Sequence, residues 1–198
     1  MKKLVAICLI LLVLGAGCRK ANTQTPAPPT AAPASAPAPE TEVPAAADPY
    51  AFTFTAQTLA GETVTEEIFG AHDLTMVNVW ASWCGPCRGE LKELGQLYSK
   101  LPENVGFLSV TVDDRGDLAD AQALLEENGC AFPCLDGQGS EELMKGFLNQ
   151  VMAIPTTIFF DSRGNQVGQW IVGVPRGSSV VDAYWNETQT RLDELKVK

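Results

Sequence analysis

The stretch "LTMVNVWASWCGPCRGEL", residues 74–91, places two cysteines at the junction of an apolar run and a polar, periodic segment. Residues 74–81 are almost continuously apolar, which is typical of a strand covered on both faces. After Cys84, apolar side chains recur at spacings of three and four residues, which predicts a helix. We therefore expect a buried strand, a short turn, and a helix that carries Cys84 and Cys87 in or next to its first turn.

Strand and helix patterns alternate on both sides of this stretch. Residues 51–65 alternate around a glycine and predict a β-hairpin. Residues 105–112 predict a second buried strand, and residues 156–173 predict a hairpin that turns at residues 163–165. Helices are expected over residues 117–129, 140–150 and 178–196. This order predicts an α/β fold with a mixed central sheet flanked by helices.

The spacing of Cys84 and Cys87 is compatible with three kinds of site: an electron carrier, half of a zinc site, or a structural disulfide. The N-terminus of a helix offers unpaired N–H groups and the positive end of the helix dipole, which lower the pKa of a thiol placed there. Cys84 is therefore the expected nucleophile. Cys87, one turn further on, could attack the resulting mixed disulfide and release the product.

The residues around the cysteines resemble the thioredoxin superfamily. "WASWCGPC", residues 80–87, is similar to its active site, and "AIPTTIFFDSRG", residues 153–164, is similar to its cis-proline segment. The lead-in at residues 52–65 is similar to that of the TlpA/ResA group of membrane-tethered extracytoplasmic thioredoxins. The resemblance covers residues 50–198 and implies a thioredoxin-like fold with an N-terminal β-hairpin extension.

The resemblance also implies roles for individual residues. Pro155 would be cis and lie against the cysteines, and Ile154 would pair through its main chain with a substrate. Trp83 would flank the reactive sulfur as a contact surface, together with Gly85 and Pro86, the dipeptide that the superfamily associates with a low reduction potential. Trp80, by contrast, is expected to pack in the core.

Two positions differ from cytoplasmic thioredoxin. Asn78 replaces a buried aspartate and cannot relay a proton. Glu90 lies three residues after Cys87, about 60° from it around a helix, on the inward stripe. The resemblance to ResA-like reductases implies a partly buried acid here, which could exchange a proton with Cys87. The alternative is a solvated acid that stabilises the helix dipole.

Cys130 and Cys134 form a second pair, in "NGCAFPCLDG". A fully extended segment would separate their Cα atoms by about 13 Å, so a disulfide requires a turn between them. We favour a structural disulfide in an oxidising compartment. The alternatives are an auxiliary redox pair, two unpaired thiols, and a zinc site shared with Cys84 and Cys87.

The first residues have the features of a secretory signal: basic residues, an apolar run over residues 4–14 and small residues before Cys18. Residues 1–17 resemble a bacterial lipoprotein signal, which implies acylation of Cys18, although leucine lies one place too early. Ordinary cleavage and an uncleaved anchor are the alternatives. Residues 18–49, rich in proline and alanine, are expected to form an extended tether without a core. The domain would thus lie outside the cytoplasm.

The net charge of −10 argues against nucleic acid and anionic lipid as partners of the folded domain. His72 is the only histidine and is expected in a loop, so a Cys-His hydrolase is unsupported.

These features lead us to expect a monomeric, lipid-anchored protein-disulfide reductase at the bacterial membrane, with no organic cofactor and no metal. The resemblance implies an electron donor of the CcdA/DsbD type, and apocytochrome c or oxidised methionine sulfoxide reductase as substrates. The alternatives are a disulfide oxidase, a peroxiredoxin-like thiol peroxidase and a tethered, zinc-stabilised binding module.

Overall fold

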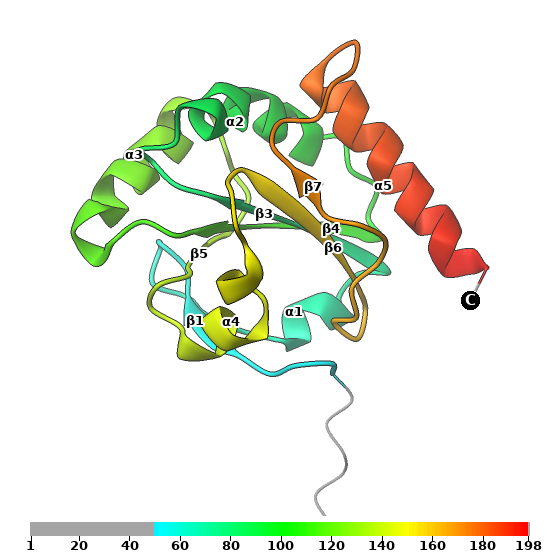
Figure 1. Cartoon of the computed structure of the whole chain (residues 1–198), viewed down its shortest axis with the longest axis horizontal. Helices are drawn as coiled ribbons and strands as arrows, with labels where there is room; N and C mark the ends of the chain where they lie inside the picture. Colours follow the sequence, from blue (N-terminus) through cyan, green and yellow to red (C-terminus); the bar gives the residue numbers. More distant parts are fainter. Residues whose placement is uncertain (1–49, 198) are drawn as a thin grey trace, which may run out of the picture. The chain divides into compact units, whose positions relative to one another are not determined.

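The computed structural model describes residues 50–197 (Figure 1). The signal peptide, Cys18 and the tether expected over residues 1–49 lie outside the described residues. Within residues 50–197, no helix is both long enough and apolar enough to cross a bilayer. The elements are β1 (Thr55–Gln57), β2 (Thr63–Thr65), α1 (Glu67–Gly70), β3 (Leu74–Trp80), α2 (Gly85–Tyr98), β4 (Val105–Thr111), η1 (Arg115–Asp117), α3 (Leu118–Glu127), β5 (Cys134–Asp136), α4 (Glu141–Gly146), η2 (Leu148–Gln150), β6 (Thr156–Asp161), β7 (Ile171–Val172) and α5 (Val180–Lys196).

The main sheet is mixed, with strand order β5-β4-β3-β6-β7. The central strand β3 pairs parallel with β4 and antiparallel with β6, and β5 extends the parallel side. All residues of β3 and β4 are buried, because layers of structure cover both faces of the sheet. The expected α/β fold with a mixed sheet is confirmed.

The sheet separates two apolar clusters, one on each face. Successive side chains of β3 point to opposite faces, so Met76 and Trp80 pack toward α2, α3 and α5, whereas Val77 and Val79 pack toward β1, α1 and α4. Figure 1 shows these two groups of elements on either side of the sheet. The loop from β3 to α2 therefore lies at the edge of a rigid core.

The two expected hairpins are present, but they pair over short lengths. β1 and β2 pair antiparallel around a turn in which Gly61 has a φ of 84°. The second hairpin turns at residues 163–165, as predicted. Its strands β6 and β7 pair at only two positions, because the chain leaves the sheet near Gly168, where φ is 68°, before it returns.

Candidate active site

The β3–α2 junction presents Cys84 at the start of α2. Cys84 has extended backbone angles and caps the helix, and its Sγ accepts a hydrogen bond from the backbone N–H of Cys87 at 3.3 Å. Pro86 fits in the first turn because its missing N–H would have no partner within the helix. The sequence placed this helix start correctly.

Cys84 and Cys87 form a disulfide, with their Cα atoms 5.3 Å apart. Cys84 retains 5% of its surface exposed and Cys87 none. After reduction, the first sulfur would therefore be the one within reach of another protein. The Cys87 N–H and the positive end of the α2 dipole also favour a thiolate at Cys84.

A buried carboxylate, which the sequence did not single out, fixes the loop before Cys84. Asp113 follows β4 and accepts hydrogen bonds from the Ser82 N–H at 2.8 Å and from the Ser82 hydroxyl at 2.7 Å. Thr111 at the end of β4 also donates to this carboxylate. The signal that could have revealed it is an acid directly after the strand that neighbours β3.

The Ile154–Pro155 peptide bond is cis, as expected. The carbonyl oxygen of Ile154 lies 3.7 Å from Cys84 Sγ, which brings together segments 70 residues apart in sequence. The Thr156 hydroxyl donates to the Ala153 carbonyl at 2.7 Å, and the Gly173 N–H donates to the Pro155 carbonyl at 2.7 Å. These bonds hold the loop beside the disulfide.

Glu90 points inward from α2 and is only 1% exposed. Its Oε1 accepts from Asn78 Nδ2 at 3.2 Å, and its Oε2 accepts from Tyr184 Oη at 3.0 Å. Burial raises the pKa of Glu90 to about 7, although the two hydrogen bonds oppose this rise. Residues three apart on a helix are neighbours, so Glu90 lies next to the buried Cys87. The sequence missed Tyr184, which lies on the buried stripe of α5.

Trp80 is completely buried, as expected, and Trp83 is 66% exposed. A groove of about 470 Å³ runs beside Trp83. The β3–α2 loop, α2, η1 and α3 supply the rest of its walls: Ser82, Arg88, Asp117, Asp120, Ala123, Leu124 and Glu127. An exposed aromatic ring beside the disulfide is available to contact another protein.

The favoured disulfide between Cys130 and Cys134 is not present: both cysteines are free thiols. No tight turn closes between them, and they contact different elements. Cys130 donates to the Leu91 carbonyl of α2 at 3.2 Å, and the backbone of Asn128 and Gly129 just before it packs closely against Gly95. Cys134 begins β5 and is buried among β3 and β4 side chains. Burial raises the pKa of each thiol to about 11.

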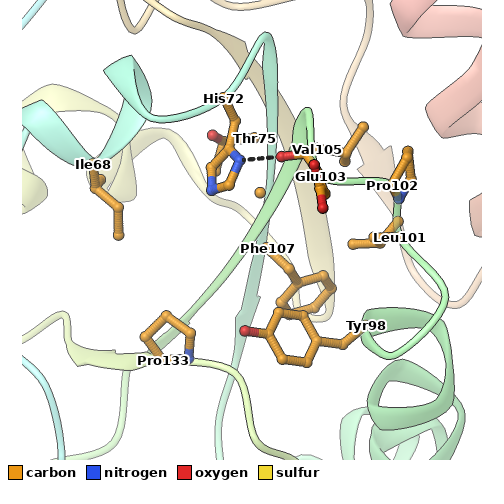
Figure 2. A pocket seen from close by; sticks show the side chains of 11 residues that line it. Ile68, His72, Thr75, Tyr98, Leu101, Pro102, Glu103, Val105, Phe107 and Pro133 are labelled. Carbon is orange, nitrogen blue, oxygen red and sulfur yellow. Dashed lines mark hydrogen bonds between the residues drawn. The ribbon is translucent and has the colours of Figure 1, made fainter.

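No group of three or more potential metal ligands gathers within residues 50–197. Figure 2 shows a separate pocket of about 290 Å³, at the end of β3 and β4 opposite the cysteines. There, His72 lies in a loop, as predicted, and its Nδ1 lies 3.0 Å from the Glu103 carbonyl oxygen. A side chain at Gly106 would collide with the imidazole ring. None of the residues expected at the active site lines this pocket.

Comparisons with known proteins relate this chain to thiol-disulfide oxidoreductases. The profile of the AhpC/TSA family matches residues 47–167. Sporulation thiol-disulfide oxidoreductase A of Bacillus subtilis is 29% identical over 169 residues, covering 82% of this chain and 86% of that protein. Thiol-disulfide oxidoreductase ResA of Oceanobacillus iheyensis is 30% identical over 90 residues, covering 45% and 44%. The structure of MTB DsbF aligns with a TM-score of 0.54 at 26% identity, covering 72% of this chain and 94% of that one.

Proposed function

We propose that this chain, which belongs to the thioredoxin-like AhpC/TSA family and is a thiol-disulfide oxidoreductase, reduces protein disulfides outside the cytoplasm. The observation that carries this proposal is the position of Cys84: it caps α2, accepts the Cys87 N–H and lies beside the Ile154 carbonyl. A sulfur in this position is an activated nucleophile next to main chain that can pair with a substrate.

The reaction would begin with the reduced protein. The Cys84 thiolate attacks one sulfur of a substrate disulfide, forming a mixed disulfide and releasing the first substrate thiolate, which takes up a proton. Cys87 then loses its proton and attacks Cys84 Sγ, which forms the Cys84–Cys87 disulfide and releases the second substrate thiol. Counted from the dithiol, two electrons and two protons pass to the substrate: Cys84 has released its proton to solvent on forming the thiolate, and Cys87 releases its own in the second step, so one disulfide replaces another.

Glu90 is the proposed proton acceptor for Cys87. Its buried carboxylate neighbours the resolving cysteine, and its pKa of about 7 lets it both accept and return a proton near neutral pH. Trp83, Gly85 and Pro86 would form the contact surface around the reactive sulfur. Ile154 would offer its main chain to the substrate, on the side where Cys84 Sγ lies.

The direction of electron flow follows from how stable the reduced form is. Cationic groups near a dithiol stabilise its thiolates and make the disulfide a stronger oxidant. The buried ionisable group next to Cys87 is instead an acid, Glu90, whose negative charge disfavours a Cys87 thiolate. Together with the Gly85–Pro86 dipeptide, this favours a reductant.

A reductant outside the cytoplasm needs a supply of electrons, which we assign to a membrane donor of the CcdA/DsbD type. Residues 1–17 would direct export, Cys18 would carry the lipid, and residues 18–49 would hold the domain away from the membrane. The substrates to compare are apocytochrome c disulfides and oxidised methionine sulfoxide reductase. The redox-active group would be the cysteine pair itself, without a cofactor.

Matched turnover assays on the full chain in detergent test the proposal. The reduced protein should reduce insulin disulfides, and it should oxidise a reduced, unfolded protein only slowly. Cys84→Ser should abolish insulin reduction, whereas Cys130→Ser should leave it intact. Faster oxidation than reduction would instead identify a disulfide oxidase, and peroxide turnover that persists in Cys87→Ser would identify a thiol peroxidase.

A further inference from the structure

Four buried side chains from four different elements form a closed hydrogen-bond ring beneath the cysteines. Asn78 belongs to β3, Glu90 to α2, Thr157 to β6 and Tyr184 to α5, and each is at most 1% exposed. Asn78 Nδ2 contacts Glu90 Oε1 at 3.2 Å and Thr157 Oγ1 at 3.1 Å. Thr157 Oγ1 lies 3.2 Å from Tyr184 Oη, which lies 3.0 Å from Glu90 Oε2.

Two chains of hydrogen bonds run from Asn78 to the carboxylate of Glu90. The Asn78 amide has two N–H hydrogens, and it donates one to Glu90 and one to Thr157. The Thr157 hydroxyl then donates to Tyr184, and the Tyr184 hydroxyl donates to Glu90. Both arms start at one amide nitrogen and end on the two oxygens of Glu90. The ring therefore satisfies an ionised Glu90.

The Asn78 amide directs its nitrogen, and not its oxygen, toward Glu90 and Thr157. Its Oδ1 is buried without a hydrogen-bond partner among the described residues. Turning the amide over would place Oδ1 against Glu90 Oε1, where two acceptors would repel each other while Glu90 is ionised. A buried acceptor without a partner costs free energy. In this orientation Oδ1 has no partner, but both N–H groups donate, one to Glu90 and one to Thr157.

A protonated Glu90 does not fit the ring as well. A proton on Oε2 would make Tyr184 accept from Glu90 and donate to Thr157 instead. The Thr157 hydroxyl hydrogen would then lack an acceptor, because the Asn78 group that faces it is a donor. The two protonation states of Glu90 thus differ in hydrogen-bond satisfaction, and the ring offsets part of the burial that favours the neutral acid.

We propose, building on the proposed function, that Tyr184 and Thr157 are positioning residues for the exchange reaction: with Asn78, they hold Glu90 in its ionised, proton-accepting form beside Cys87. Asn78 lies where cytoplasmic thioredoxin has its buried acid. In this chain the acid has moved to the helix, and the strand position supplies a donor to it.

The surroundings of Glu90 contain few other charges that could produce the same effect. On α2, the neighbouring titratable groups are Cys87 and Glu93, and the negative charge of Glu93 opposes ionisation of Glu90. The side chains that contact Glu90 from α5 and β3 are Tyr184 and Asn78, and β6 adds Thr157 through the ring. The hydrogen bonds from Tyr184 and Asn78 to Glu90 are therefore the interactions that favour its carboxylate.

Titration of Glu90 itself tests the proposal without any substrate. In the oxidised full chain, the ¹³C shift of the Glu90 carboxyl is followed against pH, with Glu90→Gln used to assign the signal. Tyr184→Phe should increase the proton affinity of Glu90 by about tenfold or more, because a hydrogen bond to a charged group is lost. Thr157→Ser, which keeps the hydroxyl, should leave the affinity unchanged. A change below about twofold in Tyr184→Phe would overturn the proposal.

Thr157→Val provides a second test, because it removes only the indirect arm and leaves Tyr184 in place. We expect the proton affinity of Glu90 to rise by about two- to threefold, as for the loss of one weak neutral hydrogen bond. In each variant, the pH midpoint for resolution of a mixed disulfide by Cys87 should rise by the logarithm of the same fold-change. An unchanged midpoint would contradict the link to exchange. Because the titration uses the oxidised protein alone, it distinguishes failure of this proposal from failure of the reductase assignment.

Discussion

Two closely spaced cysteine pairs lie in the same domain, and the structure places them in opposite situations. Cys84 and Cys87 form a disulfide at the start of α2, where Cys84 accepts a backbone N–H. Cys130 lies between α3 and β5 and Cys134 is the first residue of β5; both are free thiols, and burial raises the pKa of each to about 11.

The comparison shows that short spacing between cysteines does not by itself make a redox centre. A helix start brings the first pair within disulfide distance, provides an N–H donor to Cys84 and leaves 5% of Cys84 exposed. The second pair has a bend instead of a helical turn, and its thiols contact different elements. Backbone geometry, rather than spacing, decides which thiols can exchange.

The largest expected effect comes from serine substitutions in both pairs. Cys84→Ser should abolish disulfide exchange, and Cys87→Ser should accumulate mixed disulfides with substrates, because the resolving thiol is lost. The matched variants Cys130→Ser and Cys134→Ser should keep exchange at nearly the wild-type rate. Non-reducing gels and insulin reduction measure these outcomes, and strong loss of exchange in Cys130→Ser would break the contrast between the pairs.

Glu90, which lies next to the first pair, should make folding stability depend on pH. Its pKa rises from 4.5 to about 7 on folding, so the folded protein binds more protons than the unfolded chain within this range. Stability should therefore fall by up to about 3 kcal/mol as pH rises through it. In Glu90→Gln this loss should disappear.

Urea unfolding of the oxidised protein at about pH 5 and about pH 8 measures the difference. Equal pH dependence in wild type and Glu90→Gln would show that Glu90 titrates as a solvated acid.

Folding should lower the thiol reactivity of Cys130 by about 100-fold. A rise in the pKa of Cys130 from 9.0 to about 11 lowers its thiolate fraction by this factor at a given pH below 9. Iodoacetamide labelling followed by mass spectrometry should show slow reaction of Cys130 in the folded protein and an ordinary rate in denaturant. Similar rates in both conditions would contradict the buried environment described for this thiol.

The smallest expected effects are on stability at the second pair. Cys134 is buried against Trp80 and the sheet, so Cys134→Ala should lower the free energy of unfolding by about 1–2 kcal/mol. Cys130 is only half-buried, and Cys130→Ala should cost less than about 1 kcal/mol. Denaturant unfolding measures both changes. A larger loss of stability in Cys130→Ala than in Cys134→Ala would contradict the burial described for the two thiols.

The fold and the first pair could be predicted from sequence because their signals are local. Apolar runs, helical periodicity and the start of α2 at Gly85 depend on neighbouring residues. The inward direction of Glu90 also followed from helical spacing. These predictions did not require knowledge of how distant segments pack.

Other features depend on contacts between distant segments and could not be predicted. Tyr184 reaches Glu90 across 94 residues, and Asp113 holds Ser82 from the neighbouring strand. The predicted disulfide between Cys130 and Cys134 was wrong for the same reason. The segment before Cys130 packs against α2 at Gly95, which the local sequence does not reveal, and the Cys130 thiol contacts Leu91.

The reduction potential of the Cys84–Cys87 pair distinguishes a reductant from an oxidant. The chain from Tyr50 to Lys198, which contains both apolar clusters, would be equilibrated in graded thiol/disulfide buffers beside a Cys130→Ser/Cys134→Ser version. We expect a potential near or below about −250 mV that is the same in both proteins. A potential above roughly −150 mV would identify an oxidant and contradict this expectation, and a shift on removal of the second pair would contradict the separation of the two pairs.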